Sequence, residues 1–262
     1  MARGFNGNVA NYLEASSTPV TARPLSLATH FYLNDNTVLK VPFCIGRSTG
    51  STNGDFQILL RGAGGGNLMS ASVTGGTAEH VNLSGTTPAT GVWHTAAVSY
   101  DSDASKTITG VLDGGSQASG TSTVVPAALD RVCVGIRRRK SSTLDAPFDG
   151  YVAWSAIWNV TLTSAEQTAL TTGAHPYSIR PASLVWFCGD MHGTGGEVDH
   201  IGGRDLSETG TATSVESPMV SHPWLPNWSR QAAAAPGGGL PPRGINARGA
   251  LGGVQINGGQ IA

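Results

Sequence analysis

The sequence predicts an all-β protein, folded as a two-sheet antiparallel jelly-roll sandwich, and three observations carry this prediction. Several segments alternate apolar and polar residues with the period of two that marks a half-buried strand. The turn-forming residues glycine and proline occur 36 and 14 times among 262 residues. Hydrophobic residues make up 39% of the chain and charged residues only 13%. This balance is typical of short strands joined by tight turns.

The expected elements follow one another through the middle of the chain. Residues 93–100 alternate between two faces, so we expect this strand to bury one of them; that face carries His94, Ala96, Val98 and Tyr100 and the other Thr95, Ala97 and Ser99. Asp113-Gly114 predicts a tight hairpin turn after the next strand, because glycine tolerates the positive φ that such a turn requires.

Two more strands and a helix are expected further along. Val132, Val134 and Ile136 alternate with polar or small residues and are expected to share the buried face of a strand. Residues 151–158 are apolar on both faces, which suits a central strand that is covered on both sides. Thr163 and Glu166 have the spacing of a capping box, which predicts a short helix over residues 164–170.

In this order, the segments resemble the laminin-G-like branch of the concanavalin A-like lectin/glucanase superfamily. The resemblance rests on Trp-His-x-x-Ala from Trp93, Val-Leu-Asp-Gly from Val111, Val134-Gly135, Pro-Phe-Asp-Gly-Tyr from Pro147 and Ile-Trp-Asn-Val-x-Leu from Ile157. It covers residues 5–225 and implies a concanavalin A-like sandwich. It says little about the ligand, because one fold hosts many functions. We therefore predict a laminin-G-like β-sandwich over residues 1–225, followed by a distinct C-terminal segment over residues 226–262.

The C-terminal segment is rich in glycine and proline and contains no Asp, Glu or Lys. Such a segment cannot build its own core against backbone entropy. One interpretation is a floppy terminus. The other, which we adopt as the prediction, is an extended attachment arm whose scattered apolar side chains are buried by a partner. The predicted partner-binding residues are Trp224, Trp228, Arg230, Leu240, Arg243, Ile245, Arg248, Leu251 and Ile256; the two tryptophans could instead seal the bottom of the core.

Glycoside hydrolysis is the first activity to consider, because glucanases share the fold that the resemblance implies. Their active strand resembles Glu-x-Asp-x-x-Glu, in which alternate carboxylates act as nucleophile and acid. This chain has Glu197-Val198-Asp199 without the last carboxylate, within glycine-rich surroundings that predict a hydrated loop. His94 adjoins no nucleophile motif and is expected to be a core or hydrogen-bonded histidine. We predict no catalytic residue and no enzymatic activity.

Other candidate sites are weak. Asp101-Ser102-Asp103 offers hard oxygen ligands for calcium, but turn-forming Asp is the ordinary explanation, so we predict no cofactor, with calcium as the alternative. Residues 137–140, Arg-Arg-Arg-Lys, predict a solvated loop, or else an ion-pairing contact with an acidic neighbour. A net charge of −1 and no aromatics interleaved with this cluster predict no nucleic-acid partner. No stretch approaches the roughly 18 apolar residues of a membrane span.

Cysteines and tryptophans are assigned mainly to the interior. The number of cysteines is odd and no two of them are closely spaced, which predicts three buried free thiols, at Cys44, Cys133 and Cys188. The tryptophans expected in the core are Trp93, Trp154, Trp158 and Trp186.

Three classes of function are consistent with these features. The first, and our prediction, is a non-enzymatic structural protein of a bacteriophage virion. It would most simply be a capsid decoration protein that self-associates and binds other virion subunits through its arm. The N-terminus lacks the apolar core of a signal peptide, as expected for assembly in the host cytoplasm. The second is a carbohydrate-binding module or a tail-associated receptor-binding protein that contacts a cell-surface glycan. The third, a glucanase, is disfavoured by the incomplete carboxylate motif.

Overall fold

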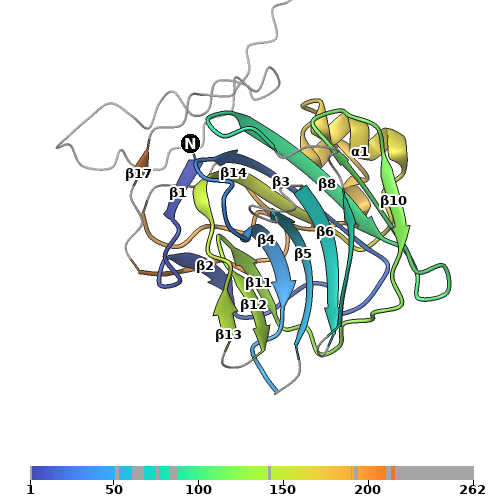
Figure 1. Cartoon of the computed structure of the whole chain (residues 1–262), viewed down its shortest axis with the longest axis horizontal. Coiled ribbons are helices and arrows are strands. Elements are labelled where there is room, and N and C mark those ends of the chain that lie inside the picture. Colours follow the sequence, from blue (N-terminus) through green and yellow to red (C-terminus); the bar gives the residue numbers. More distant parts are fainter. Residues whose placement is uncertain are drawn as a thin grey trace, which may run out of the picture. The chain divides into compact units, whose positions relative to one another are not determined.

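A computed structural model shows two large antiparallel sheets packed face to face, with a short helix, α1 (Ser164–Thr171), outside them (Figure 1). The structure describes residues 2–50, 53–60, 68–74, 77–82, 88–140, 143–189, 191, 194–210 and 214–215. They lie within one unit, Met1–Val220. The fold prediction is confirmed, whereas the predicted arm, residues 226–262, lies outside the described residues.

The first sheet, sheet A, contains in spatial order β10 (Ala118–Thr121), β9 (Thr107–Leu112), β8 (Trp93–Tyr100), β3 (Leu25–Leu33), β14 (Asp149–Trp158), β1 (Ala2–Asn6) and β17 (Ser214–Val215), with β15 (Leu184–Cys188) also paired to β14. Two short 3-10 turns, η1 (Pro176–Ser178) and η2 (Pro181–Ser183), precede β15. Within the described part of the chain, no helix has the length and apolar character needed to cross a membrane.

The second sheet, sheet B, contains in spatial order β16 (Ser207–Thr209), β2 (Tyr12–Ala15), β11 (Arg131–Val134), β4 (Lys40–Gly46), β5 (Gly54–Leu60), β6 (Leu68–Thr74) and β7 (Thr77–Asn82). A separate two-stranded hairpin, β12 (Arg137–Lys140) and β13 (Thr143–Asp145), packs through β12 against β4 and β5. It covers part of the outer face of sheet B.

Aromatic contacts hold the two sheets together across the core. The rings of Phe43 on β4 and Trp186 on β15 stack with centroids 5.7 Å apart. The rings of Phe56 on β5 and Tyr100 on β8 lie 4.5 Å apart. All four side chains are fully buried. Such pairs contribute burial of large apolar surface and also fix the sheets relative to each other.

The outer face of β8 differs from the prediction that only one face of this strand is buried. Ala96, Val98 and Tyr100 face the core as expected, but Ala97 is also fully buried. It packs with Leu170 of α1 in a second apolar cluster. The helix therefore covers the face that was expected to be solvated.

The start of α1 follows the predicted capping box. The hydroxyl of Thr163 accepts a hydrogen bond from the backbone N–H of Glu166, and the Glu166 carboxylate accepts one from the backbone N–H of Thr163. These bonds satisfy N–H groups that have no partner within the helix.

The alternation predicted for residues 131–136 breaks at Gly135. Val132 and Val134 face the core between the sheets, whereas Ile136 packs in a separate cluster on the outer face of sheet B. Gly135 has a φ of +82°, which turns the chain out of the sheet towards β12. Placing Ile136 on the same face as the two valines was therefore wrong, because the regular strand ends at Val134.

Most of the predicted interior residues are confirmed. Cys44, Cys133 and Cys188 are buried free thiols. Trp154, Trp158 and Trp186 are buried, but Trp93 is only half-buried. Its ring stacks on His30 with centroids 4.7 Å apart, on the part of sheet A where the outer face also carries half-buried Tyr32.

His94 is hydrogen-bonded and buried, as predicted. Its Nδ1 lies 2.6 Å from Oδ2 of Asp113 and its Nε2 lies 2.9 Å from the carbonyl oxygen of Ala89. Burial acts to lower the pKa of His94, but the bonds to Asp113 and Ala89 and the charge of Asp113 outweigh it and raise the pKa above 6.5. This histidine ties the loop before β8 to the turn after β9.

We expect the change Gly135→Ala to destabilise the protein by about 2 kcal/mol or more, because an added Cβ would lie 2.3 Å from the ring of Phe5 and because the backbone is left-handed. Gly203→Ala is the matched control, since Gly203 also has a positive φ but an added Cβ would meet no atom within 4 Å. Urea unfolding of both variants measures the difference. Equal losses would contradict the steric argument.

We expect the His94–Asp113 contact to stabilise the fold more in acid than in alkali. The raised pKa means that its contribution is fully present below about pH 6.5 and is lost as the pH rises through the folded-state value. The difference in unfolding free energy between wild type and Asp113→Asn should therefore be larger at pH 6 than at pH 8.5. An NMR titration that places the His94 pKa at or below 6.5 would refute this.

Candidate functional site

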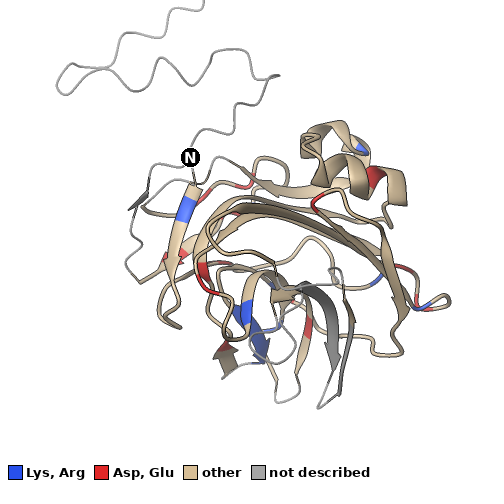
Figure 2. Cartoon of the chain, turned by 45° about the horizontal axis from the view of Figure 1, so that its top comes forward, with Lys and Arg blue, Asp and Glu red and all other residues tan. Residues whose placement is uncertain are grey.

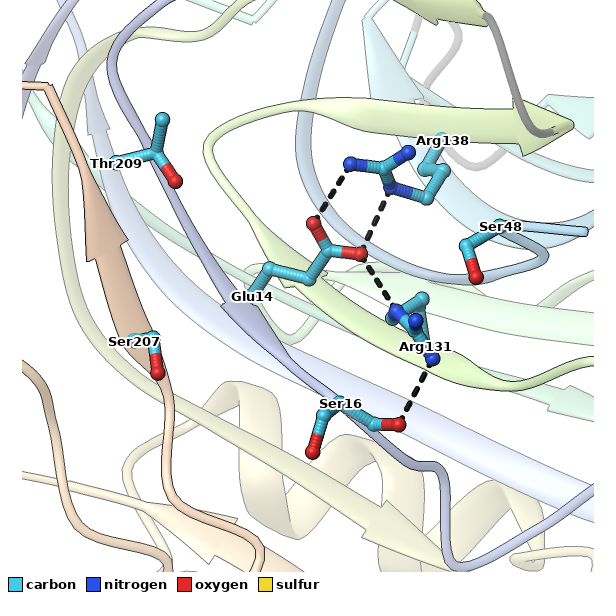
Figure 3. A pocket seen from close by; sticks show the side chains of 7 residues that line it. All are labelled: Glu14, Ser16, Ser48, Arg131, Arg138, Ser207 and Thr209. Atoms are coloured by element: carbon cyan, nitrogen blue, oxygen red, sulfur yellow. Dashed lines mark hydrogen bonds and ion pairs between the residues drawn. The ribbon is translucent and has the colours of Figure 1, made fainter.

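A polar pocket of about 290 Å³ lies on the outer face of sheet B (Figure 3). It is lined by Glu14, Ser16, Ser48, Arg131, Arg138, Ser207 and Thr209. Strands β2 and β11 supply its floor, the edge strand β16 supplies one wall, and β12 of the hairpin supplies another.

The strand register explains why these side chains meet. Glu14 lies opposite Ser207 on one side and opposite Cys133 on the other. Its chain neighbours Leu13 and Ala15 face the core. Because successive side chains of a strand point to opposite faces, Glu14 and Ser207 point outwards, and so does Arg131, two residues before Cys133.

Glu14 fixes both arginines of the pocket, and Figure 3 shows its carboxylate between their guanidinium groups. Arg138 approaches Oε1 with Nε at 2.8 Å, and its Nη2 donates to Oε2 at 2.8 Å. Arg131 approaches Oε1 with Nε at 2.9 Å. Burial acts against the charge of Arg138, but the hydrogen bond and charge of Glu14 outweigh it and raise the pKa of Arg138. Both guanidinium groups are held in a fixed orientation by their contacts with Glu14.

Several donors of the pocket keep no partner in the described structure. Arg131 also donates from Nη1 to the carbonyl oxygens of Ser16 and Asp130, at 2.8 and 2.9 Å. No hydrogen bond of the described residues uses Nη2 of Arg131 or Nη1 of Arg138. The hydroxyls of Ser207 and Thr209 lie on exposed positions beside them. These groups are available to a ligand.

The charges around the pocket balance. Asp130 accepts hydrogen bonds from the backbone N–H and hydroxyl of Ser48, at 2.6 and 2.9 Å, and its Oδ2 lies 3.8 Å from Nη1 of Arg131. Two guanidinium groups thus accompany two carboxylates. Because both carboxylates are already engaged, the free polar atoms are mainly donors. The arrangement can bind an uncharged or anionic ligand rich in oxygen acceptors.

The expected hydrated loop around Glu197 and Asp199 was wrong. The two residues are only 2% and 4% exposed. Glu197 lies 3.5 Å from Nη1 of the fully buried Arg3. Asp199 accepts hydrogen bonds from backbone N–H groups of β15 and of its own loop, at Phe187, Ile201, Gly202 and Arg204. Both carboxylates are bound within the fold rather than presented to solvent.

The solvated loop expected at residues 137–140 was also wrong, and the alternative of ion pairing is confirmed within the chain. These residues form β12, drawn as a blue strand in Figure 2. Arg137 donates to both oxygens of Asp145 on β13, at 2.6 and 3.0 Å. Arg138 reaches Glu14, 124 residues earlier in the chain.

The remaining candidates do not join the pocket. Asp101 accepts hydrogen bonds from the backbone N–H of Ser102 at 2.8 Å and from the hydroxyl of Thr161 at 3.1 Å, which is a turn-ordering role. Asp103 is exposed. Among the described residues, no group of His, Cys, Asp or Glu is arranged to hold a metal ion. The predicted partner-binding residues, from Trp224 to Ile256, lie outside the described residues.

Sequence reasoning missed Glu14 and Arg131, although one signal was present. Glu14 interrupts the apolar run of Tyr12, Leu13 and Ala15, and a charged residue at that place marks the outward face of a strand. Nothing local indicates that Arg138 lies beside it.

Comparison with known proteins identifies the fold family. A family model described as the concanavalin A-like lectin/glucanases superfamily matches residues 6–166. No curated protein sequence matches the chain. A heptameric SAP-like pentraxin from Limulus polyphemus is similar in structure, with a TM-score of 0.53 and 15% identity over 79% of this chain and 94% of that chain.

Bacterial sialidases supply further structural neighbours. The K499G mutant of NanB sialidase from Streptococcus pneumoniae has a TM-score of 0.50 and 14% identity over 66% of this chain and 27% of that chain. The chain thus spans only about a quarter of that protein. The CBM40 domain of a Ruminococcus gnavus sialidase, bound to α2,3-sialyllactose, has a TM-score of 0.49 and 13% identity over 65% and 95% of the two chains.

At these identities the pentraxin and the NanB sialidase show a shared fold and nothing more specific. The family match carries the assignment, because it spans more than half of the residues. The chain belongs to the concanavalin A-like lectin/glucanases superfamily.

Proposed function

We propose that the chain is a non-catalytic carbohydrate-binding protein and that its saccharide site is the pocket around Glu14, Arg131 and Arg138. The observation that carries this proposal is the pair of guanidinium groups held by one carboxylate, with donor atoms left free and serine and threonine hydroxyls around them. Saccharides present dense oxygen atoms to such groups. A volume of about 290 Å³ lies at the small end of ligand sites, which suits one sugar residue at a chain end.

The free donors favour an acidic saccharide over a neutral one. Glu14 is already engaged by both arginines, so the pocket offers Nη2 of Arg131 and Nη1 of Arg138 to acceptors on the ligand. A carboxylate or sulfate group on a sugar supplies charged acceptors, and charge-assisted hydrogen bonds are stronger than neutral ones. Neutral sugars would use the same donors through hydroxyl oxygens, with lower affinity.

The virion role predicted from the sequence stays a prediction, as do its partners and its location. A tail-associated protein that binds a cell-surface glycan would use the proposed pocket, whereas a capsid decoration protein would depend on the C-terminal arm. The two ideas separate experimentally. Removing residues 231–262 should leave saccharide binding at the pocket unchanged, because the side chains proposed to bind the ligand all lie between Glu14 and Thr209.

We expect Arg131→Ala to weaken binding of an acidic saccharide by about tenfold to hundredfold, since one hydrogen bond to a charged group contributes roughly 1.5–3 kcal/mol. A glycan array of acidic and neutral saccharides identifies the ligand, and calorimetry measures its affinity. Arg180→Ala is the matched control, because Arg180 is also ion-paired, to Glu166, and is not a pocket residue. Thermal unfolding of both variants checks that they are folded.

Two results would count against this proposal. Wild-type protein that binds no saccharide of the array would contradict the function. Binding that Arg131→Ala and Arg180→Ala weaken equally would place the site away from this pocket.

A further inference from the structure

The β12–β13 hairpin lies over a buried polar pair on the outer face of sheet B. Asp55 and Gln57, both on β5, are 0% and 1% exposed. Nε2 of Gln57 donates a hydrogen bond to Oδ1 of Asp55 at 3.0 Å. Oδ2 of Asp55 and Oε1 of Gln57 are buried and have no hydrogen-bond partner among the residues that the structure describes. Two buried acceptors without donors are costly, and more so if the carboxyl group is ionised.

A proton on Asp55 resolves this shortage. It converts Oδ2 into a donor, for which Oε1 of the neighbouring amide is an available acceptor, while Oδ1 keeps its bond from Nε2. Burial, the largest influence, raises the pKa of Asp55 to about 7, although Arg137 and Arg139 act to lower it. The carboxyl group is therefore neutral in mildly acidic solution.

Two arginines of the hairpin lie near Asp55 but are already ion-paired with another carboxylate. The charged groups that act on Asp55 are Arg137 and Arg139 on β12 and Asp145 on β13, and the titratable Cys44 on β4 lies opposite Gln57. Both arginines bond to Asp145. On the flanking strands the register partners of Asp55 are Gly46 and Val73, which do not titrate. An ionised Asp55 would thus be buried without a counter-ion of its own.

The same hairpin forms a wall of the pocket. Along β12, Arg137 and Arg139 bond to Asp145, whereas Arg138 between them bonds to Glu14 in the pocket. The hairpin backbone touches sheet B closely, because a Cβ added at Gly46 would lie 2.0 Å from the carbonyl oxygen of Arg138. A displacement of the hairpin from β5 therefore moves Arg138 relative to Glu14.

We propose that the β12–β13 hairpin is a latch that closes over protonated Asp55, and that ionisation of Asp55 loosens it and weakens ligand binding at the adjoining pocket. The latch is inferred from the position of the hairpin over the buried Asp55–Gln57 pair. Its effect on ligand binding rests on the function proposed above. In the closed state Asp55 holds its proton up to about pH 7, whereas in an open state it would meet water and titrate near 3.8. Closure is thus most favourable below about pH 4, weakens up to tenfold per pH unit, and levels off above pH 7.

The reactivity of two buried thiols measures opening of the latch in the absence of any ligand. Cys44 and Cys133 are fully buried in a cluster with Ile136 and Ala146, which flank the hairpin. We would measure their alkylation by iodoacetamide at each pH, normalised to the unfolded chain at the same pH. Protection should fall tenfold or more between pH 5 and pH 7 and then level off. Cys188, buried in the core between the sheets, serves as the internal control and should show no such change.

Variants assign the effect to Asp55. Asp55→Asn cannot ionise, so protection of Cys44 and Cys133 should become independent of pH, while Asp103→Asn, at an exposed acid, should behave as wild type. Asp145→Asn tests the same idea if Asp55→Asn does not fold. It frees Arg137 and Arg139 to pair with Asp55, so the pH at which protection levels off should move down. Constant protection in the wild type, or unchanged pH dependence in Asp55→Asn, would overturn the latch.

Ligand binding is measured separately, so the two proposals can fail separately. With an acidic saccharide from the array, affinity should be higher at pH 5.5 than at pH 8, and this difference should vanish in Asp55→Asn. A latch seen by thiol labelling together with pH-independent affinity would overturn the coupling to the pocket. Absence of saccharide binding at both pH values would refute the proposed function, and the thiol measurement would still decide on the latch.

Discussion

The left-handed backbone of Gly135 is the constraint on which the arrangement of the outer face of sheet B depends. It ends β11 and lets the chain leave the sheet and return over it as β12 and β13. The N–H of Gly135 donates to the carbonyl oxygen of Pro42, and its own carbonyl accepts from Phe148, so both sides of the bend are fixed. The ring of Phe5 occupies the space that a side chain would need. Without this bend, Arg138 would not reach Glu14 and Asp55 would face solvent.

The bend also explains how a chain with few charges comes to bury several of them. Residues 137–140 are the densest run of positive charge, and as a strand of the hairpin they meet carboxylates from two directions. Asp145 lies on the adjoining strand, and Glu14 lies on β2. Opposite charges within 3 Å satisfy one another, but each is committed to its partner. Asp55 is the group left over, and burial rather than charge then governs its protonation.

The parts of the fold that the sequence predicted are those that depend on neighbouring residues. The turn at Asp113-Gly114 has positive φ at both residues, 49° and 70°. The capping box from Thr163 to Glu166 also formed as expected. Both follow from side chains and backbone within four residues of each other.

The parts that could not be predicted depend on residues far apart in the sequence. Arg138 and Glu14 are 124 positions apart, and Arg3 and Glu197 are 194 apart. Composition alone predicts that the arginines of residues 137–139 and the carboxylates of Glu197 and Asp199 are solvated. What makes them structural is a partner that only the folded sheets bring near, and neither period nor spacing contains that information.

The two outer faces of the sandwich explain why the proposed site lies on sheet B. On sheet A, α1 packs on β8 and β9, where its Leu170 shares an apolar cluster with Ala97 and its buried Gln167 donates a hydrogen bond to Ser99. On sheet B the cover is a narrow hairpin that reaches β4 and β5 but leaves the side towards β16 open. The pocket is the trough between the hairpin and that edge strand. Its floor belongs to the sheet and one wall to the hairpin, so changes in the hairpin can tune the wall while the fold keeps the floor in place.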